Sequence, residues 1–132
     1  MEYETTLDVR FRDIDAMGHV NNAVYATYAE QARANYFVDV LDRELSAVGS
    51  VLATITMDYR QPILLDDGPL TVAIDVPDLG ESSIPMNYEI RTADGTLAAE
   101  IESVQVAYDR EAGESRAIPE DWREAIESYH GL

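Results

Sequence analysis

The fold of this chain turns on one stretch, VRFRDIDAMGHVNN at residues 9–22. Its first residues alternate apolar and charged side chains, as a strand does, and residues 23–37 then carry apolar side chains at helical spacing. Between the two patterns lie two acids, a glycine, a histidine and an asparagine pair. Polar groups at a junction between regular elements are held in place by both elements. We therefore expect the functional site at this junction and a sheet that wraps the helix.

The elements around this stretch follow from hydrophobic periodicity. Residues 2–12 alternate throughout, which predicts one half-buried strand. We expect Asn21 or Asn22 to be the N-cap of the helix, and the helix to end between Leu41 and Arg43. One face of this helix is marked at three- and four-residue steps by Tyr25, Ala29, Ala32, Tyr36 and Val40.

The remainder of the chain predicts four more strands and a short helix. Alternation with a period of two covers residues 51–60, 70–76, 86–90 and 97–108, with turn residues at 66–69 and 93–95. In the last of these strands the apolar parity changes near Ser103, which predicts a bulge or a curl that exchanges the two faces. Pro119 opens the short C-terminal helix. Hairpin-spaced strands beside a long helix indicate a single α+β domain over residues 1–132, with a mostly antiparallel sheet.

Composition narrows the class of protein. The chain has 132 residues, of which 46% are hydrophobic, enough to bury the core of one domain. It has no cysteine, which excludes a disulfide framework, a thiolate nucleophile and a zinc ribbon. No apolar run reaches membrane-spanning length, and no basic segment followed by an apolar one stands at the N-terminus. We expect a cytoplasmic protein with no membrane partner.

The charge of the chain is strongly negative. Twenty-six acidic residues face nine basic ones, for a formal net charge of −17, and all nine basic residues are arginine. An acidic, lysine-free chain with clear periodicity indicates adaptation to high salt, where ions screen the repulsion between like charges. Nucleic acids and anionic membranes need a basic face, so we expect neither as a partner.

The residues of the junction resemble a known family. The motif Asp13-x-Asp15-x-x-Gly18-His19-Val20-Asn21-Asn22-x-x-Tyr25, with Glu30 and Arg33 on the following helix, resembles hotdog-fold acyl-CoA thioesterases of the 4-hydroxybenzoyl-CoA thioesterase type. The later segments Tyr59-Arg60-Gln61-Pro62, Gly80 to Ser83 and Ile118-Pro119-Glu120 are similar to that family too. The resemblance implies a long central helix wrapped by a curved antiparallel sheet of about five strands. It also implies a homodimer or homotetramer that pairs sheets edge to edge, active sites at the dimer interface, and Asp15 as the catalytic carboxylate.

The chemistry of thioester hydrolysis suits this junction. Hydrolysis needs a carboxylate that attacks the carbonyl or activates water, and a donor that polarises the carbonyl oxygen. A helix N-terminus offers unpaired N–H groups with partial positive charge. We expect Asp15 to be the nucleophile or general base and the N–H of Asn22 to be the donor. No cofactor is expected, since coenzyme A enters as part of the substrate.

Other polar residues are candidates for binding the substrate or shaping its pocket. Gly18 lets the chain turn. Glu30 corresponds to the catalytic acid of another hotdog subgroup, but with Arg33 it also forms an ordinary surface pair at i, i+3. We expect Asp13 to be structural, paired with Arg10 or Arg12. The full set of expected substrate-binding residues is Gly18, His19, Tyr25, Glu30, Arg60, Ser82 and Ser83, with Arg91 and Arg110 as further candidates for the CoA phosphates.

Several alternatives stay open. His19 either orders the loop or borders the pocket, and a histidine-based metal site lacks partners because the only other histidine is His130. Ser82 and Ser83 follow Gly80 in a loop without a recognisable base, so a serine hydrolase is excluded. Two other functions compete with the thioesterase: a non-catalytic acyl-CoA-binding protein, and a hotdog enoyl-thioester hydratase that would use Asp13 with His19.

Overall fold

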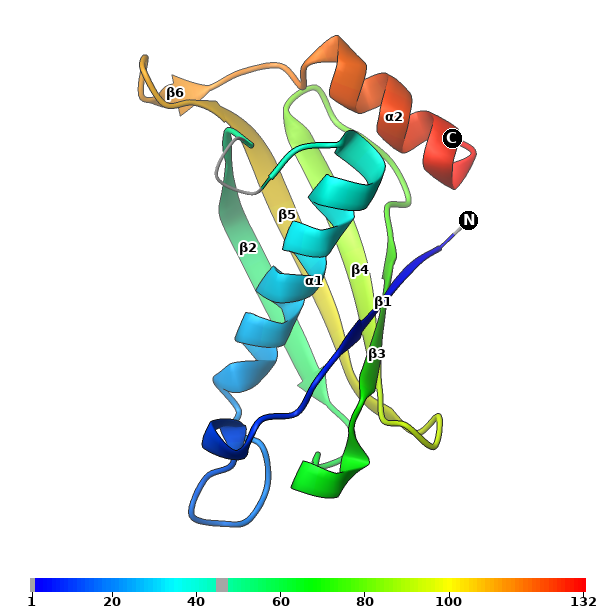
Figure 1. Ribbon diagram of the computed structural model, residues 1–132. Coiled ribbons are helices and arrows are strands. Elements are labelled where there is room, and N and C mark those ends of the chain that lie inside the picture. The colour runs from blue at the N-terminus through cyan, green and yellow to red at the C-terminus, as the bar shows by residue number, and fades with distance from the viewer. Residues whose placement is uncertain (1, 45–47) are drawn as a thin grey trace.

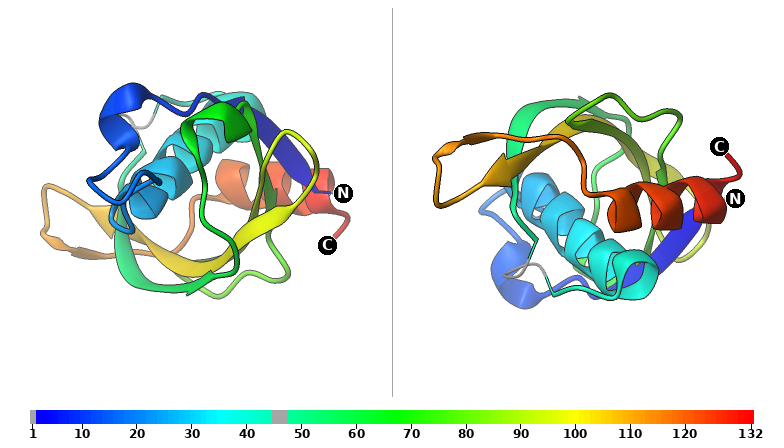
Figure 2. Two further views of the ribbon diagram at one scale, coloured as in Figure 1. Left: turned by 90° about the horizontal axis from the view of Figure 1, so that it is seen from below. Right: turned by 90° about the horizontal axis from the view of Figure 1, so that it is seen from above.

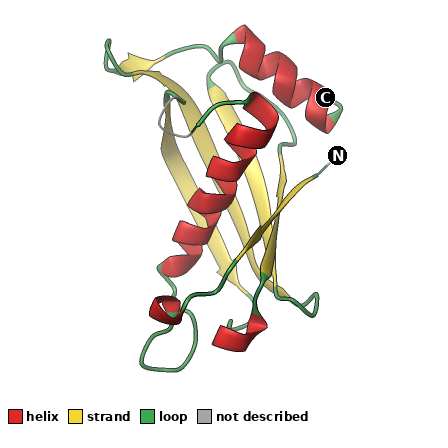
Figure 3. Cartoon of the chain, viewed as in Figure 1, coloured by secondary structure: helices red, strands yellow, loops and turns green. Residues whose placement is uncertain are grey.

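The computed structural model describes residues 2–44 and 48–132. A long helix, α1 (Val24–Leu41), lies along the concave side of a curled antiparallel sheet, and a second helix, α2 (Glu120–His130), covers one end of that sheet (Figures 1 and 3). This is the α+β layout that the sequence predicts. Neither helix in the described residues is long and apolar enough to cross a membrane.

The sheet has the strand order β1-β3-β4-β5-β2, and every neighbouring pair is antiparallel. The short strand β6 pairs with the end of β5 and lies off this path. Since β2 is paired only with β5, it forms one edge of the sheet. The strand bounds are β1 (Tyr3–Leu7), β2 (Ser50–Tyr59), β3 (Leu70–Asp75), β4 (Ser83–Arg91), β5 (Leu97–Asp109) and β6 (Glu114–Ser115).

The core lies between α1 and the concave face of the sheet. The predicted apolar face of the helix is the face that is buried, and its alanines, Ala29 and Ala32, are fully buried. Small side chains at these positions let the sheet approach the helix closely, so that strand side chains fill the space between them. The strands contribute fully buried residues at alternate positions, namely Val72, Ile74, Ile84, Met86, Tyr88, Ile90, Ala99 and Ile101.

The first strand is shorter than the alternation predicts. β1 ends at Leu7, and residues 11–13 form a 3-10 turn in which Phe11 is 82% exposed. The turn is closed by Asp13, whose N–H donates to the Arg10 carbonyl at 2.9 Å and whose carboxylate accepts from the Arg10 N–H at 2.9 Å. The prediction of one strand over residues 2–12 is therefore wrong beyond Leu7, because local hydrogen bonds to an acid outweigh an apolar alternation.

The predicted change of faces near Ser103 is also wrong. From Ala99 onward β5 keeps one parity, with Ser103, Gln105 and Ala107 all buried. The register shifts lie elsewhere: in β2 between Leu52 and Thr54, and in β5 at Ala98, since Ile90 pairs with Ala99 and Arg91 with Leu97. Ser103 Oγ has a partner, the Tyr88 hydroxyl at 2.7 Å. Gln105 is satisfied only in part: its Oε1 accepts from Ser50 Oγ at 3.3 Å, while its Nε2 is buried without a hydrogen-bond partner among the described residues.

Arg33 belongs to the same buried network. It is only 6% exposed, and its guanidinium donates to the Tyr88 hydroxyl at 3.0 Å. Glu30 points to solvent instead, and no ion pair joins the two side chains in the described part of the chain. The predicted surface pair of Glu30 with Arg33 is therefore wrong, since the arginine turns toward the sheet.

Acidic side chains gather on the convex face of the sheet. Asp58 lies opposite Glu100 on the neighbouring strand, and Glu100 lies opposite Glu89. Like charges directly opposite one another destabilise a sheet. Two ion pairs relieve part of this repulsion, Arg60 to Glu100 at 3.2 Å and Arg91 to Glu89 at 3.5 Å.

This face makes salt dependence a direct expectation. We expect the melting temperature to rise from dilute buffer to molar KCl, because ions screen the repulsion among these carboxylates. The double variant Asp58→Asn/Glu102→Gln, measured by circular dichroism over the same series, should melt higher in dilute buffer and respond less to salt. A flat or falling melting temperature for the unmodified chain would overturn the inference of salt adaptation.

Candidate active site

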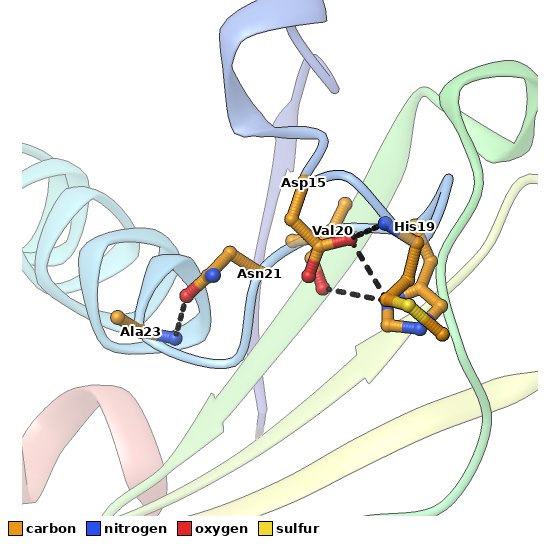
Figure 4. A network of polar contacts seen from close by, with 6 residues as sticks. Asp15, His19, Val20, Asn21 and Ala23 are labelled. Atoms are coloured by element: carbon orange, nitrogen blue, oxygen red, sulfur yellow. Dashed lines mark hydrogen bonds and ion pairs between the residues drawn. The ribbon is translucent and has the colours of Figure 1, made fainter.

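The junction folds into a closed loop between Ile14 and Val20, which form an isolated β-bridge. The Asp15 N–H donates to the His19 carbonyl at 2.9 Å, and the Gly18 N–H donates to the Asp15 carbonyl at 3.1 Å. Gly18 has a φ of +88°, a conformation that side chains other than hydrogen disfavour. The predicted turning role of Gly18 is therefore confirmed, and the loop presents Asp15 and His19 together (Figure 4).

The Asp15 carboxylate is partly accessible, with its side chain 24% exposed. One oxygen, Oδ1, accepts from the Met17 N–H at 2.9 Å and lies 3.8 Å from Nδ1 of His19. In the part of the chain that the structure describes, Oδ2 has no hydrogen-bond partner. Asp15 thus stabilises its own turn with one oxygen and leaves the other available to react.

The start of α1 lies directly beside this loop. The N-cap of α1 is Ala23, without a side-chain cap, so the prediction of Asn21 or Asn22 as the N-cap is wrong. Asn21 closes the turn that precedes the helix: its side-chain oxygen accepts from the Ala23 N–H and its carbonyl from the Val24 N–H, each at 2.9 Å. The Asn22 N–H finds no acceptor among the described residues. The Asn22 carbonyl accepts from the Tyr59 hydroxyl at 3.1 Å, which orients this peptide from the end of β2. A donor without an intramolecular acceptor is therefore held at a helix N-terminus, where backbone N–H groups carry partial positive charge.

A cavity of about 160 Å³ opens at this helix start. Four predicted site residues line it together, namely His19, Asn22, Tyr25 and Arg60, with Val20, Tyr59, Gln61 and Pro62. Tyr25 is buried and meets the Tyr59 ring edge-on, with ring centroids 4.9 Å apart. The alternation of β2 gives no sign of a site role for Tyr59, because only the folded chain brings the end of β2 to Asn22.

Asp13 has the structural role that the sequence predicts. It is buried, its carboxylate accepts from the Tyr28 hydroxyl at 2.8 Å, and it forms an ion pair with Arg10 at 3.7 Å. Burial, and then this hydrogen bond to the carboxylate, raise the pKa of the Tyr28 phenol above its ordinary value. Both oxygens of Asp13 are engaged, so this acid is not available to substrate.

The remaining predicted residues do not line this cavity in the single chain. Asp15 and Gly18 belong to the loop that carries His19 but are not among the residues that line the cavity. Glu30 is exposed on α1 and does not line it. Ser83 is the first residue of β4 rather than part of a loop, and it pairs with Val106, whereas Tyr59 pairs with Ala99. Seven residues of extended β5 separate those two partners, so Ser82 and Ser83 lie about 23 Å from the cavity. Within the described residues, no group of three or more histidine, aspartate or glutamate side chains is arranged to hold a metal ion.

Comparison with known proteins agrees with this geometry. The model of the thioesterase-like superfamily matches residues 9–126. A thioesterase of Thermus thermophilus, crystallised with coenzyme A and zinc, is 37% identical, with a TM-score of 0.88 over 98% of this chain and 94% of that one. Two Staphylococcus aureus structures share the fold at lower identity. The DHNA-CoA thioesterase is 22% identical, with a TM-score of 0.86 over 99% of this chain and 92% of that one. SAV2348, in complex with CoA, is 18% identical, with a TM-score of 0.87 over 99% of this chain and 85% of that one.

The family match includes the loop of Asp15, the helix start at Asn22 and the strand that ends at Tyr59. All the residues around the cavity therefore fall within the matched region. The curled sheet around a long helix is the hotdog architecture of these relatives. Since the family model matches residues 9–126, the chain belongs to the thioesterase-like superfamily.

Proposed function

We propose that this protein hydrolyses an acyl-CoA thioester to a free acid and CoA, with Asp15 as the catalytic carboxylate. One observation carries the proposal: Asn22, whose backbone N–H has no acceptor among the described residues, lines a cavity together with His19, and the Asp15 carboxylate, which has a free oxygen, lies 3.8 Å from His19 in the same loop. Thioester hydrolysis needs a carboxylate and a carbonyl-polarising donor of these two kinds.

The reaction follows from these two groups. The thioester carbonyl oxygen accepts from the Asn22 N–H, which stabilises the negative charge that develops as the carbonyl carbon is attacked. As a general base, Asp15 takes a proton from water while the water oxygen bonds to that carbon. The carbon–sulfur bond then breaks, and the thiolate leaves and is protonated to the thiol. As a nucleophile, Asp15 instead forms an acyl anhydride that water hydrolyses to the same products.

Coenzyme A is the thiol carrier that the comparisons favour. The Thermus thermophilus thioesterase was crystallised with coenzyme A, and it shares 37% of its residues with this chain over nearly its whole length. The acidic composition of the chain gives no comparable support for an acidic carrier protein, which would be repelled by a net charge of −17.

A homodimer completes the proposal. Within the described residues, β2 is a ten-residue edge strand with no neighbour on its outer side, and Val51 and Leu52 are 42% and 44% exposed. Exposed edge strands of this length are normally covered, and pairing with the β2 of a second copy covers the edges of both copies at once. Antiparallel pairing of two β2 strands places the start of each beside the end of the other. Ser83 lies too far from the cavity of its own chain, but this pairing brings the partner subunit's Ser83 toward that cavity.

One observation favours a second candidate, an enoyl-thioester hydratase. The hydratase alternative that the sequence suggests pairs Asp13 with His19, but Asp13 is buried and fully engaged. The structure instead places His19 beside Asp15, with 3.8 Å between Nδ1 and Oδ1. An imidazole that lines a cavity, with a carboxylate beside it, provides the groups that add water across an enoyl double bond.

The test is to supply a panel of saturated acyl-CoAs and one enoyl-CoA to the purified protein in molar KCl. We expect release of free thiol, followed with a thiol reagent, and no loss of the enoyl absorbance beyond that caused by hydrolysis. Hydration without thiol release would make the protein a hydratase. Saturable binding of the esters with neither reaction would make it a non-catalytic acyl-CoA-binding protein.

A further inference from the structure

Tyr59 is the last residue of β2, and its hydroxyl reaches the start of α1. Seen along the helix, the sheet curls around α1, so that the end of β2 comes round toward the start of the helix (Figure 2). The hydroxyl donates to the Asn22 carbonyl at 3.1 Å and lies 3.5 Å from the Met57 sulfur, which is the weaker acceptor. The ring packs edge-on against Tyr25, with 4.9 Å between the centroids. Tyr59 therefore links the sheet to the helix through a packed ring and a hydrogen bond.

The end of the strand that carries Tyr59 is fixed to the rest of the sheet. The N–H groups of Arg60 and Gln61 both donate to the Ala98 carbonyl, at 2.8 and 3.1 Å. Ile63, four residues after Tyr59, is fully buried. These contacts hold the connection that leaves β2 at two points, so a side chain that projects from it has a defined position.

This connection contacts both groups that the proposed mechanism uses. Val20, in the loop that carries Asp15, donates its N–H to the Ile63 carbonyl at 2.8 Å. Asn22, which carries the proposed donor, accepts from the Tyr59 hydroxyl. The first contact joins two backbone groups, whereas the second depends on one side-chain hydroxyl. Removing that hydroxyl should therefore loosen the donor and leave the loop with Asp15 in place.

The other contacts around the donor are local. The Asn22 N–H shares a peptide group with the Asn21 carbonyl, which accepts from the Val24 N–H, and the Asn21 side chain accepts from the Ala23 N–H, each at 2.9 Å. These bonds join residues within three positions of one another, so they set the shape of the turn. The Tyr59 hydroxyl, 37 residues later, sets the position of the turn against the sheet. A backbone donor stabilises a transition state only if it is held where negative charge develops.

We propose that Tyr59 is a positioning residue for thioester hydrolysis, whose hydroxyl holds the Asn22 backbone so that its N–H faces the thioester carbonyl. The inference rests on the proposed function. The hydroxyl acts through the backbone and takes no part in the covalent steps. It should therefore affect the rate of the chemical step rather than the affinity for the substrate, since alignment matters most in the transition state.

The test is Tyr59→Phe, which removes the hydroxyl and keeps the ring against Tyr25. We expect kcat for a good acyl-CoA in molar KCl, measured by release of free thiol, to fall by about 10- to 100-fold, because a small misplacement of a catalytic group is costly. KM should change by less than about twofold, since uniform binding is kept. An unchanged kcat, or a loss of kcat/KM that comes from KM alone, would overturn the proposal.

The matched control is Tyr129→Phe. The Tyr129 hydroxyl also donates to a backbone carbonyl far away in the sequence, that of Glu2 at 3.5 Å, but it lies outside the cavity. This variant should keep the kcat and the KM of the unmodified protein. An equal loss of kcat in both variants would show a general effect of losing a tyrosine hydroxyl and would refute the positioning role.

Amide hydrogen exchange, followed by NMR, tests the same contact without relying on activity. In Tyr59→Phe we expect the N–H groups of Ala23 and Val24 to exchange about tenfold faster, because the turn loses its bond to the sheet. The Val20 N–H should exchange as before, since its bond to Ile63 remains. Equal exchange at the helix start in both proteins, or faster exchange at Val20 as well, would overturn the inference. If the unmodified protein releases no thiol, the proposed function fails, and exchange still decides whether Tyr59 holds the helix start.

Discussion

Asp15→Asn is expected to lower kcat for acyl-CoA hydrolysis by about 10²- to 10⁴-fold, and further if the carboxylate is the nucleophile. Asparagine keeps the volume of the side chain and an oxygen that can accept from the Met17 N–H, so the loop should stay folded. It can neither take a proton from water nor attack a carbonyl. The measurement is kcat on a good acyl-CoA, with melting temperature and oligomer mass recorded alongside.

The comparison variant for Asp15 is Glu30→Gln, which makes the same isosteric change at an exposed acid on α1, away from the loop that carries Asp15 and His19. Its kcat should stay within a few-fold of that of the unmodified protein. Asp13→Asn is less suitable, because Asp13 is buried against Tyr28 and its loss should lower stability as well as activity. If Asp15→Asn turns over normally while Glu30→Gln is inactive, the assignment of the carboxylate is wrong. If neither changes kcat, thioester hydrolysis at this site is itself refuted.

Leu52→Glu should dissociate the proposed dimer and abolish activity with it. Leu52 lies on the exposed edge strand at 44% exposure, so a single chain tolerates the change. In the dimer, two copies of the strand would each bury a new carboxylate against an already acidic protein. We expect the dissociation constant of the dimer to rise by about 10²-fold or more, since burial of each unpaired charge costs more than about 1.4 kcal/mol. Light scattering in molar KCl gives the mass, and kcat/KM at the same protein concentrations gives the activity.

The matched control for the edge is Leu132→Glu, which makes the same substitution at 50% exposure on the last residue of the chain. It adds the same charge to the protein but lies away from β2, so mass and activity should not change. Circular dichroism should show native secondary structure for both variants. A Leu52→Glu protein that stays dimeric and active would place the dimer interface elsewhere, and a fully active monomer would exclude any role of the dimer in catalysis.

Local patterns in the sequence were sufficient to predict the elements of the fold. The long helix ends at Leu41, within the predicted boundary, and the predicted turn at residues 93–95 connects β4 to β5, with the Thr92 N–H donating to the Thr96 carbonyl at 3.0 Å. Periodicity succeeds here because a helix or a strand must place its apolar residues on one side at a fixed spacing. The polar junction could also be located from the sequence, because Gly18 and the asparagine pair determine the backbone conformation of residues next to them in the chain.

Periodicity failed where a side chain is held by a residue far away in the sequence. Arg33 is buried because Tyr88, 55 residues later, accepts its hydrogen bond, and Ser103 is buried because it shares that tyrosine. The prediction that Phe11 lies in the first strand failed for a local reason: the turn that Asp13 closes takes Phe11 out of that strand. The type of a residue and its spacing from neighbouring residues do not show which distant residue it contacts in the folded chain.

The sequence by itself determined the order of the main elements, the loop that carries Asp15 and the start of the long helix to within two residues. Only the tertiary structure decided that the end of β2 closes the cavity, with the Tyr59 hydroxyl bound to a carbonyl 37 residues earlier. It also decided that the arginines at residues 110 and 116 face the opposite end of that strand. The physical reason is that backbone periodicity is a local property, whereas a site is assembled from segments whose proximity depends on how the whole sheet curls around its helix.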